Sequence, residues 1–368
     1  MTSETVSAFR LARHQLAGRK KASVESICAA VCGIQAQVMS AAELELWTRN
    51  HALRREDIFS ALWKRRSVVK TSAMRQTLHL LAADDFPIYI AALKRSRMAA
   101  FARLLARLKV TREQSDDMQQ MILDGLAGGP TTQQALVRLA QAKAGTRVRR
   151  WLEFATSALR PSIVQGLVCY GPPRGSEVTL VRADQWLGKQ RTVDEDDAKR
   201  ELIRRFLGAY GPATCRDFVK WSGIPMSEAK PAWNTVLSEM TEVIVDRAPA
   251  WILSRDAKAF DAVADAAQTV RLLPAFDVYL LAHAQKDHLV PPQFYKRVYR
   301  NQGWLSPVVL HGGRIVAVWS LRAAAKTQLV EVEPFQKLAK TVKAGIEEEV
   351  GALSGFLNAP CRVLFGRD

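Results

Sequence analysis

The feature that most constrains the fold of this 368-residue chain is one pattern of elements that occurs three times. Short segments with apolar residues at helical spacing are followed by two runs rich in β-branched residues. This order is typical of a winged helix, in which a helix-turn-helix precedes a two-stranded wing. The sequence therefore predicts a mainly helical α+β fold that begins with three tandem winged-helix units.

The first predicted unit spans residues 1–110. Its two β-rich runs, Ser67–Ser72 and Thr77–Ala82, are expected to pair as the wing. Four expected helices precede this wing: Val6–Leu16, Val24–Cys32, Ala41–Asn50 and Arg55–Lys64.

The second predicted unit spans residues 111–192 and the third spans residues 193–264. In the second, Gly171–Gly175 is expected to form the turn of the wing, because it is rich in Gly and Pro. In the third, Thr214 followed by Asp217 resembles a capping box, which marks the start of a helix. The expected helices are Thr111–Leu126, Thr132–Ala142, Val148–Leu159, Glu195–Tyr210, Thr214–Ser222 and Ser227–Met240. The expected strands are Ile163–Tyr170, Glu177–Val181, Val243–Asp246 and Ala250–Leu253.

The last hundred residues follow a different pattern. Residues 265–335 contain β-branched runs, and His311–Gly313 is expected to form a tight turn, so this region predicts a small β-barrel or sheet. Residues 336–368 are expected to form a terminal helix and a last strand. The runs are Val270–Pro274, Ser306–Leu310, Ile315–Leu321, Thr327–Val332, the helix Gln336–Leu353 and the strand Cys361–Phe365.

The net charge of +17 at neutral pH favours a polyanionic partner. Residues 1–110 carry 19 Lys and Arg against 8 Asp and Glu, so the positive charge is concentrated in the first predicted unit. Double-stranded DNA fits such a surface, because basic side chains bind its phosphates whatever the base sequence. A generally basic surface that only keeps the chain dissolved is the alternative.

The sequence also indicates a compartment. Met1–Gln15 has no apolar signal-peptide core, and no segment approaches the roughly 20 apolar residues of a membrane span. Cys28 and Cys32 lie on an expected apolar helix, where buried free thiols are ordinary. These features fit a reducing cytoplasm and no association with a membrane. That the protein is a monomer and associates with the bacterial nucleoid is a further expectation that these features do not establish.

Several common kinds of site are missing from the sequence. There is no phosphate-binding P-loop, no Gly-rich dinucleotide fingerprint and no Gly-x-Ser-x-Gly elbow. The histidines do not combine with cysteines or acids at metal-ligand spacing, and only His283 and His288 lie near each other. We therefore expect neither a metal nor a cofactor.

The most informative local sequence surrounds Gln35 and Gln37. Gly33 can end the preceding helix in the left-handed conformation, and Ser40 with Glu43 resembles a capping box that would start the next helix. The stretch between them is expected to be extended, so that residues i and i+2 project on the same side. Two carboxamides side by side can hold and orient a water molecule, because each offers an acceptor oxygen and two donor hydrogens. Alternatively, both side chains only satisfy backbone groups around the interhelical turn.

The first predicted wing is basic and has a polar face. If Thr77–Leu81 is a strand, Thr77 and His79 lie on the same face of it. The surrounding basic side chains suit contacts with DNA phosphates. For His79, a purely structural role is the alternative. The expected DNA-binding residues are Lys64, Arg65, Arg66, Lys70, Arg75, Thr77 and His79.

The third predicted unit argues against an ordinary transcription factor. Its candidate recognition helix, from Ser227 to Glu239, has one Lys and no Arg, although major-groove reading relies on Arg, Lys, Asn and Gln. Two alternatives to an enzyme are nevertheless kept: a noncatalytic winged-helix transcriptional regulator that binds DNA, and a scaffold whose winged helices bind proteins.

Four short motifs occur in order along the chain: Gly33–Gln37, Ala73–His79, Phe276–Leu280 and Gly312–Trp319. Together they resemble the winged-helix DNA glycosylases that unhook interstrand crosslinks, the AlkZ-like and YcaQ-like family. The resemblance covers about residues 8–325. It implies three tandem winged helices and a C-terminal β-barrel in a C-shaped molecule that holds duplex DNA. The family's catalytic motif is Gln-x-Gln in one branch, so the resemblance implies that Gln35 and Gln37 are catalytic.

The reaction implied by the resemblance is hydrolysis of the N-glycosidic bond of N7-alkylated guanine, free or crosslinked, in duplex DNA. An N7-alkylated base is cationic and leaves as a neutral molecule, so no protein general acid is required. The enzyme has to place a water at the anomeric carbon and stabilise positive charge on the sugar, and the carbonyl oxygens of Gln35 and Gln37 can do both. No activated lysine is evident, so a monofunctional enzyme that leaves an abasic site is expected.

The chain departs from the usual family motifs at four positions. Ser72 stands where Trp is usual and Gln76 where Gly is usual. Ala317 stands where Gly is common, and His288 where an Arg usually follows the Asp. These departures bear on substrate range and activity rather than on the fold.

Overall fold

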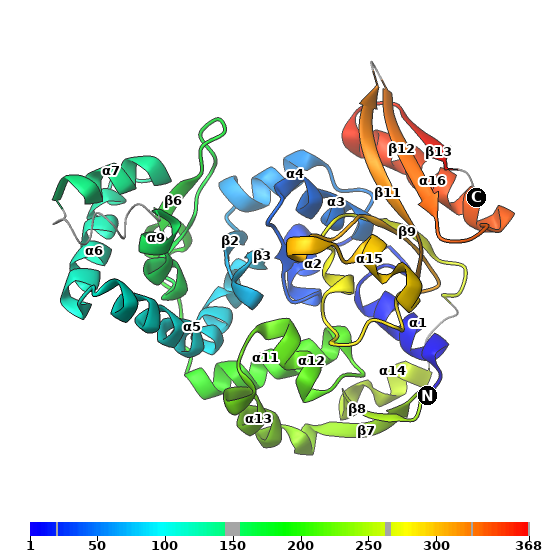
Figure 1. Ribbon diagram of the computed structural model, residues 1–368, viewed down its shortest axis with the longest axis horizontal. Coiled ribbons are helices and arrows are strands. Elements are labelled where there is room, and N and C mark those ends of the chain that lie inside the picture. Colours follow the sequence, from blue (N-terminus) through cyan, green and yellow to red (C-terminus); the bar gives the residue numbers. More distant parts are fainter. Residues whose placement is uncertain (20, 144–154, 262–265, 325–326, 367–368) are drawn as a thin grey trace.

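The computed structural model describes residues 1–19, 21–143, 155–261, 266–324 and 327–366 (Figure 1). Its strands form a six-stranded, a five-stranded and a two-stranded sheet, with helices packed against them. The expected mixture of helix and sheet is confirmed. Within these ranges no helix has the length and apolar character needed to span a lipid bilayer.

The first segment runs from α1 to β3. Strands β2 and β3 form the expected hairpin, and the short strand β1 pairs antiparallel with the other edge of β3. The expected helices and the two expected strands are therefore confirmed. The elements are α1 (Ser3–Arg13), α2 (Val24–Ala30), β1 (Ile34–Gln35), α3 (Met39–Arg49), α4 (Arg55–Phe59), η1 (Ser60–Lys64), β2 (Val68–Ser72), η2 (Met74–Gln76), β3 (Leu78–Ala82) and η3 (Ala83–Asp85).

A 23-residue helix, α5 (Phe86–Leu108), follows in a region where no element was expected. Pro87 lies in its first turn, where the missing N–H costs no helical hydrogen bond. Buried residues occur from Phe86 to Leu105, because the helix packs against both α9 (Ala155–Val164) and α11 (Glu195–Tyr210). Helix α5 therefore connects the first segment to the two that follow.

The second segment repeats the order of the first, because β4 pairs with β6 and β6 pairs with β5. The expected strand Ile163–Tyr170 begins only at Val168, since Ile163 and Val164 belong to α9. Part of the expected helix Val148–Leu159 lies outside the described residues. The elements are α6 (Arg112–Gly125), β4 (Thr131–Thr132), α7 (Gln133–Lys143), α9, β5 (Val168–Tyr170), β6 (Thr179–Arg182) and α10 (Ala183–Leu187).

The first two segments share one sheet, in the order β1-β3-β2-β5-β6-β4. The junction lies where Lys70 of β2 is opposite Tyr170 of β5. The two β-hairpins therefore lie edge to edge and form a continuous surface between the segments (Figure 1).

The third segment shows the same order once more. Thr214 caps α12 and Asp217 completes the expected capping box, which is thus confirmed. Residues Asp246 and Arg247 have φ of 47° and 68°, which gives the tight turn between β7 and β8. A bridge from Ala213 to Trp251 of β8 stands where the other segments have their short first strand. The elements are α11, α12 (Cys215–Ser222), α13 (Met226–Thr235), η4 (Leu237–Glu239), β7 (Met240–Val245) and β8 (Ala248–Leu253).

The C-terminal segment contains the five-stranded sheet, in the order β13-β12-β11-β10-β9. Strand β13 is parallel to β12, and the other neighbours are antiparallel. Of the two expected forms, barrel or sheet, these pairings describe a sheet with β9 and β13 at its edges. The short helices η5 (Ser254–Asp256) and α14 (Ala257–Asp261) end the third segment. The elements of the C-terminal segment are β9 (Val270–Leu273), η6 (Val278–Leu280), η7 (Pro292–Phe294), α15 (Tyr295–Val298), η8 (Asn301–Gly303), β10 (Val308–His311), β11 (Arg314–Ala324), β12 (Thr327–Pro334), α16 (Lys340–Leu357) and β13 (Cys361–Phe365).

The first and C-terminal segments share one hydrophobic core. Trp47 of α3, Trp319 of β11 and Ile346 of α16 belong to the same buried cluster. The indole N–H of Trp319 donates to the carbonyl oxygen of Leu273 at 3.0 Å, which satisfies its buried polar atom. Helix α3 is therefore held against the C-terminal sheet (Figure 1).

Candidate active site

Gln35 and Gln37 lie on the short stretch between α2 and α3. Gly33 has φ of +94°, a conformation that favours glycine, and its N–H donates to the Cys28 carbonyl at 2.7 Å where α2 ends. Strand β1 then pairs with β3, so that Gln35 lies opposite His79. The expected extended conformation is confirmed at Gln35, whereas Gln37 lies in a bend after the strand.

The two carboxamides differ in exposure and in partners. Gln35 is only 5% exposed, and its Oε1 accepts a 2.7 Å hydrogen bond from Nη2 of Arg75. Gln37 is exposed, and its Oε1 accepts a longer 3.3 Å bond from the backbone N–H of Leu78. The alternative role, in which the side chain only satisfies a backbone group, therefore applies in part to Gln37 but not to Gln35. The first amide is fixed, whereas the second can turn towards a ligand.

Arg75 holds Gln35 and also connects the first segment to the third. Its Nη1 donates to the carbonyl oxygen of Trp221 in α12 at 2.7 Å, while Nη2 holds Gln35. Burial lowers the pKa of Arg75 to about 10, so the guanidinium stays charged at neutral pH. The sequence predicted a phosphate contact for Arg75, but both terminal nitrogens of its guanidinium donate hydrogen bonds within the protein.

His79 lies inside the sheet and not on a surface that DNA could touch. It is 0% exposed and lies between Gln35 of β1 and Thr71 of β2. Its Nδ1 is 3.0 Å from the carbonyl oxygen of Thr77. Burial, helped by the charge of Arg75, holds the pKa of His79 well below its usual value, so the ring is neutral. A buried ring cannot reach a phosphate, so the DNA contact predicted for His79 is wrong and the structural alternative describes it.

Three of the expected DNA-binding residues are exposed at and just after the end of η1. Lys64, Arg65 and Arg66 are all at the surface. Arg65 lies 3.8 Å from Glu25, and the guanidinium of Arg66 lies 3.9 Å from the ring centre of Trp186. These contacts leave the basic groups on the surface, so they suit the predicted role.

Lys70 and Thr77 are less accessible. The ammonium of Lys70 lies 5.9 Å from the ring centre of Tyr170, and burial lowers its pKa. The hydroxyl of Thr77 donates to the Met74 carbonyl at 3.1 Å. Both residues are partly exposed, so the structure leaves a phosphate contact open to them.

Helix α3 does not begin as expected. Its N-cap is Val38, and no side chain caps it. The expected capping box of Ser40 and Glu43 is therefore wrong, because Glu43 instead lies 3.2 Å from Nε of Arg55. The chain enters α3 from a paired strand, and Val38 packs against a hydrophobic cluster of the C-terminal segment.

Behind the two glutamines, α3 carries a buried ion pair that the sequence did not predict. Nη1 and Nη2 of Arg49 donate to the two carboxylate oxygens of Asp277 at 2.9 and 2.8 Å. Glu45, one turn earlier, accepts a 3.2 Å bond from the N–H of Val278. Burial, together with Asp277, raises the pKa of Glu45 well above its usual value. The motif Phe276–Leu280 was the sequence signal for this contact.

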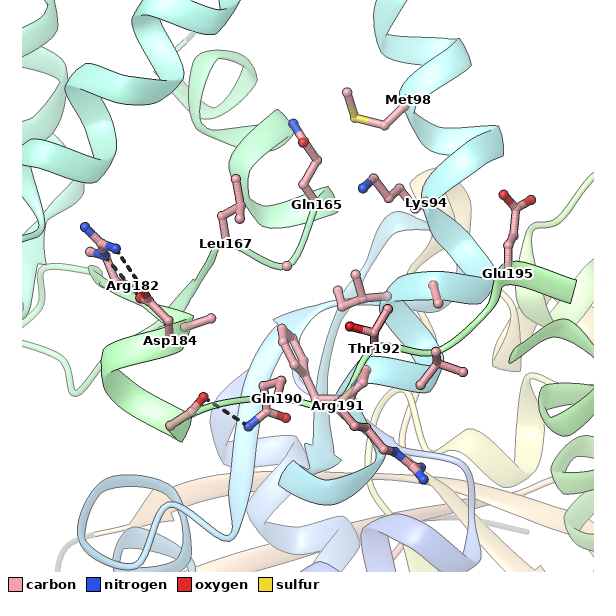
Figure 2. Close-up of a pocket in the computed structure, with 18 of the residues that line it drawn as sticks. Lys94, Met98, Gln165, Leu167, Arg182, Asp184, Gln190, Arg191, Thr192 and Glu195 are labelled. Carbon is pink, nitrogen blue, oxygen red and sulfur yellow. Dashed lines mark hydrogen bonds and ion pairs between the residues drawn. The ribbon is translucent and has the colours of Figure 1, made fainter. Parts of the chain in front are cut away.

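A cavity of about 750 Å³ lies elsewhere, between α5, the second segment and the start of α11 (Figure 2). Apolar side chains such as Met98 and Leu167 line it, together with the ion pair of Arg182 and Asp184 at 2.7 Å. The two glutamines do not line this cavity. The candidate site is thus separate from it.

Within the described ranges, no group of three or more His, Cys, Asp or Glu side chains could hold a metal ion. The rings of His283 and His288 are 5.0 Å apart. However, Nε2 of His283 lies 3.0 Å from the Tyr210 carbonyl, and burial lowers the pKa of His288 to about 2.

The four departures from the usual family motifs have distinct surroundings. Gln76 adopts φ of 62°, a left-handed conformation that suits the usual glycine better. The carbonyl of Ser72 accepts a 3.0 Å bond from Arg97. Ala317 is 0% exposed inside the C-terminal segment, whereas His288 is partly exposed and lines a pocket with Arg10 and Asp217. Gln76 is therefore the departure whose backbone conformation fits its residue type least.

The family model described as DNA glycosylase AlkZ-like matches residues 28–356. A relative from Streptomyces sahachiroi, named interstrand DNA cross-link repair glycosylase, is 32% identical over an alignment of 371 positions that covers 98% of this chain and 98% of the relative. The solved structure of Streptomyces sahachiroi DNA glycosylase AlkZ is similar with a TM-score of 0.84 and 29% identity. That match covers 99% of this chain and 100% of the solved chain.

Proposed function

The chain belongs to the AlkZ-like DNA glycosylase family, and we propose that it hydrolyses the N-glycosidic bond of N7-alkylated guanine in duplex DNA, including guanine in an interstrand crosslink. The observation that carries this proposal is the amide of Gln35, which Arg75 fixes on strand β1, together with the exposed amide of Gln37 two residues further along the chain. A noncatalytic regulator is not favoured, because the matched family and relatives are named glycosylases.

In the proposed reaction, a water molecule lies between the two amides and attacks the anomeric carbon. The carbonyl oxygen of Gln35 keeps a second lone pair when it accepts from Arg75, and Gln37 can turn its own oxygen to the same water. These oxygens also stabilise positive charge that develops on the sugar. The alkylated base leaves as a neutral molecule, and the water proton passes to a phosphate or to solvent, since an amide is a weak base.

The exposure of Gln37 supports action on a base that cannot leave the helix. Most glycosylases turn the target base into a closed pocket, which a crosslink to the opposite strand prevents. Gln37 is exposed, and neither glutamine lines the 750 Å³ cavity. The exposed amide of Gln37 can approach the sugar of a crosslinked base, which a closed pocket could not admit.

We propose a monofunctional enzyme that leaves an abasic site without cutting the strand. Lys286 is a candidate nucleophile that this proposal has to exclude, because burial lowers its pKa to about 7. The residue is 6% exposed, and its ammonium donates to the Leu280 carbonyl at 2.9 Å. An amine held inside the protein in this way cannot attack the sugar.

The proposal includes a division of the chain into three winged-helix units at residues 1–110, 111–192 and 193–264, a β-rich region at 265–335 and a terminal part at 336–368. The support is the repeated order of helix, short strand or bridge, two helices and paired strands. Duplex DNA is proposed to lie against the first unit, with phosphates bound by Lys64, Arg65, Arg66, Lys70 and Thr77.

The test is a double substitution, Gln35→Ala with Gln37→Ala. Wild-type protein and variant are incubated with duplexes that carry N7-methylguanine or a nitrogen-mustard crosslink, and heat-labile abasic sites are counted. We expect the variant to lose base release while DNA binding survives. Gln134→Ala, which removes an exposed glutamine on α7, is the matched control. Release at the wild-type rate by the double variant would refute the catalytic assignment.

A further inference from the structure

The stretch Tyr295–Trp304, called the aromatic loop below, carries exposed aromatic and basic side chains that the sequence did not single out. Tyr295 is 41% exposed and Trp304 is 53% exposed. Lys296 and Arg300 are also exposed, and neither forms an ion pair with another described residue. Single exposed aromatics are ordinary, but two of them beside two unpaired cations suit a polyanion with flat rings.

Both aromatic rings are supported from beneath by another ring. Tyr295 stacks on Tyr299 at 4.6 Å between ring centres, and the Tyr299 hydroxyl donates to the Leu280 carbonyl at 3.0 Å. Trp304 lies 5.3 Å from the ring centre of the buried Phe276. The exposed rings are therefore held in place, so a partner that stacks on them meets preorganised surfaces.

The backbone sets Arg300 opposite Trp304. Tyr299 and Leu305 form an antiparallel bridge, and the N–H of Arg300 donates to the carbonyl of Trp304 at 2.8 Å. The loop thus turns back on itself, and Arg300 and Trp304 lie opposite each other where its two ends meet. The indole can stack on a base while the guanidinium binds the neighbouring phosphate.

The aromatic loop lies beside the candidate site. Val38, which directly follows Gln37, packs against the same hydrophobic cluster as Phe276 and Tyr299. Asp277, next to Phe276, is held by Arg49 of α3. The ammonium of Lys286 lies 5.7 Å from the ring centre of Tyr299, and the charge of Arg75, which holds Gln35, helps burial to lower the pKa of Lys286. DNA bound at the two glutamines would therefore run past the loop.

We propose that the aromatic loop is a second DNA-binding site, at which Trp304 stacks on a base that has lost its neighbour beside the lesion. Arg300 and Lys296 neutralise the flanking phosphates. In an intact duplex every base is already stacked, so the indole gains this contact only where the stack is broken. This inference deepens the proposed function but depends only on DNA binding, not on the hydrolysis of N7-alkylguanine.

The test uses the full chain and two duplexes of the same sequence that contain 2-aminopurine, a fluorescent base. In one duplex the stack is intact, and in the other a tetrahydrofuran abasic analogue stands beside the 2-aminopurine. For Trp304→Ala we expect about tenfold weaker binding of the interrupted duplex or more, nearly unchanged binding of the intact duplex, and loss of the quenching of 2-aminopurine by the indole. Trp304→Phe, which keeps a ring, should retain most of the affinity.

Two controls make the result specific. Leu237→Ala removes another apolar side chain, which is 41% exposed and lies in the third segment. It should change the binding of neither duplex. Thermal unfolding of each variant shows that it is folded, and Arg300→Ala should lower the salt dependence of binding by about one unit of slope. Equal binding of the interrupted duplex by Trp304→Ala and wild type would overturn the proposal. An equal loss on both duplexes would do the same, because the contact would then not need an unstacked base.

Discussion

Nη2 of Arg75 lies 2.7 Å from Oε1 of Gln35, so a residue that the sequence placed on DNA instead holds a candidate catalytic amide. The other end of the same guanidinium is bound to Trp221 in the third segment. The third segment therefore helps to orient Gln35, although its candidate recognition helix has few groups that could read bases. A unit that is poor at binding DNA can contribute to catalysis in this way.

We predict that Arg75→Ala lowers the rate of base release about ten- to hundredfold, because a hydrogen bond from a charged donor fixes Gln35. The single-turnover rate constant on N7-methylguanine duplex measures this effect. Affinity for DNA and its salt dependence should stay close to wild type, because both guanidinium ends are occupied within the protein.

Arg75→Lys is the informative companion, since it keeps the charge but cannot span two acceptors with a planar fork. It should be slow like the alanine variant. A salt slope reduced in both variants, with an unchanged rate, would show that Arg75 binds phosphate and not Gln35.

The ion pair of Arg49 and Asp277 leads to a stability prediction. Although burial alone would lower it, the Asp277 carboxylate keeps the pKa of Arg49 above its usual value, so the pair is charged. Asp277→Ala would remove both close hydrogen bonds of a buried guanidinium and leave it only the longer contact with Glu45 at 3.6 Å, and we expect a loss of about 3–5 kcal/mol in the free energy of unfolding. Urea denaturation measures it. The double variant Arg49→Met with Asp277→Leu should lose much less free energy of unfolding. An Asp277→Ala variant as stable as wild type would contradict this account.

Local patterns predicted most of the elements. Helical periodicity located α11 with its observed bounds, and Gly33 indicated the left-handed end of α2 before an extended stretch. These features depend on neighbours in the chain. Helix α5 was missed, because its buried positions, from Phe86 to Leu105, follow from packing against two other helices rather than from one apolar stripe.

The contacts that complete the site could not be predicted. Arg75 and Trp221 are 146 residues apart in the chain, and Arg49 and Asp277 are 228 apart, so no local pattern encodes either pair. Alternation correctly placed His79 on a strand, but alternation cannot tell whether that face is covered. Its neighbours in the sheet, β1 on one side and β2 on the other, belong to the tertiary structure.

Buried histidines predict that the fold weakens in mild acid. Burial holds the pKa of His14, His79 and His283 well below the usual value. Below about pH 6.5 the unfolded chain therefore binds more protons than the folded one, and stability falls as the pH falls. Glu43 and Glu45, whose pKa values burial raises, have the opposite effect, but the histidines with a lowered pKa outnumber them. We expect a net loss on the order of 1–3 kcal/mol per pH unit between about pH 6.5 and 5.

Urea denaturation at several pH values measures this slope. His14→Phe offers the check, because His14 is 0% exposed and lies between two tyrosine rings that a phenyl ring can also pack against. The variant should show a shallower slope by about one proton. A slope that is the same in both proteins would mean that His14 is not neutral in the folded state.

The exposed cations of the first segment lead to a prediction about DNA binding. Lys64 and Arg65 are exposed, and Arg65 is only loosely paired with Glu25 at 3.8 Å. If both bind phosphates, each releases about one counterion on binding, so replacing both with Ala should reduce the slope of log affinity against log salt by about two units. The loss should be the same on any sequence, because phosphates carry no base information. Filter binding or fluorescence anisotropy across a salt series measures the slope. Lys337→Ala with Lys340→Ala removes the same charge from another exposed site and should leave the slope nearly unchanged. If both pairs lower it equally, the effect is one of net charge, and the first segment is not the surface that DNA occupies.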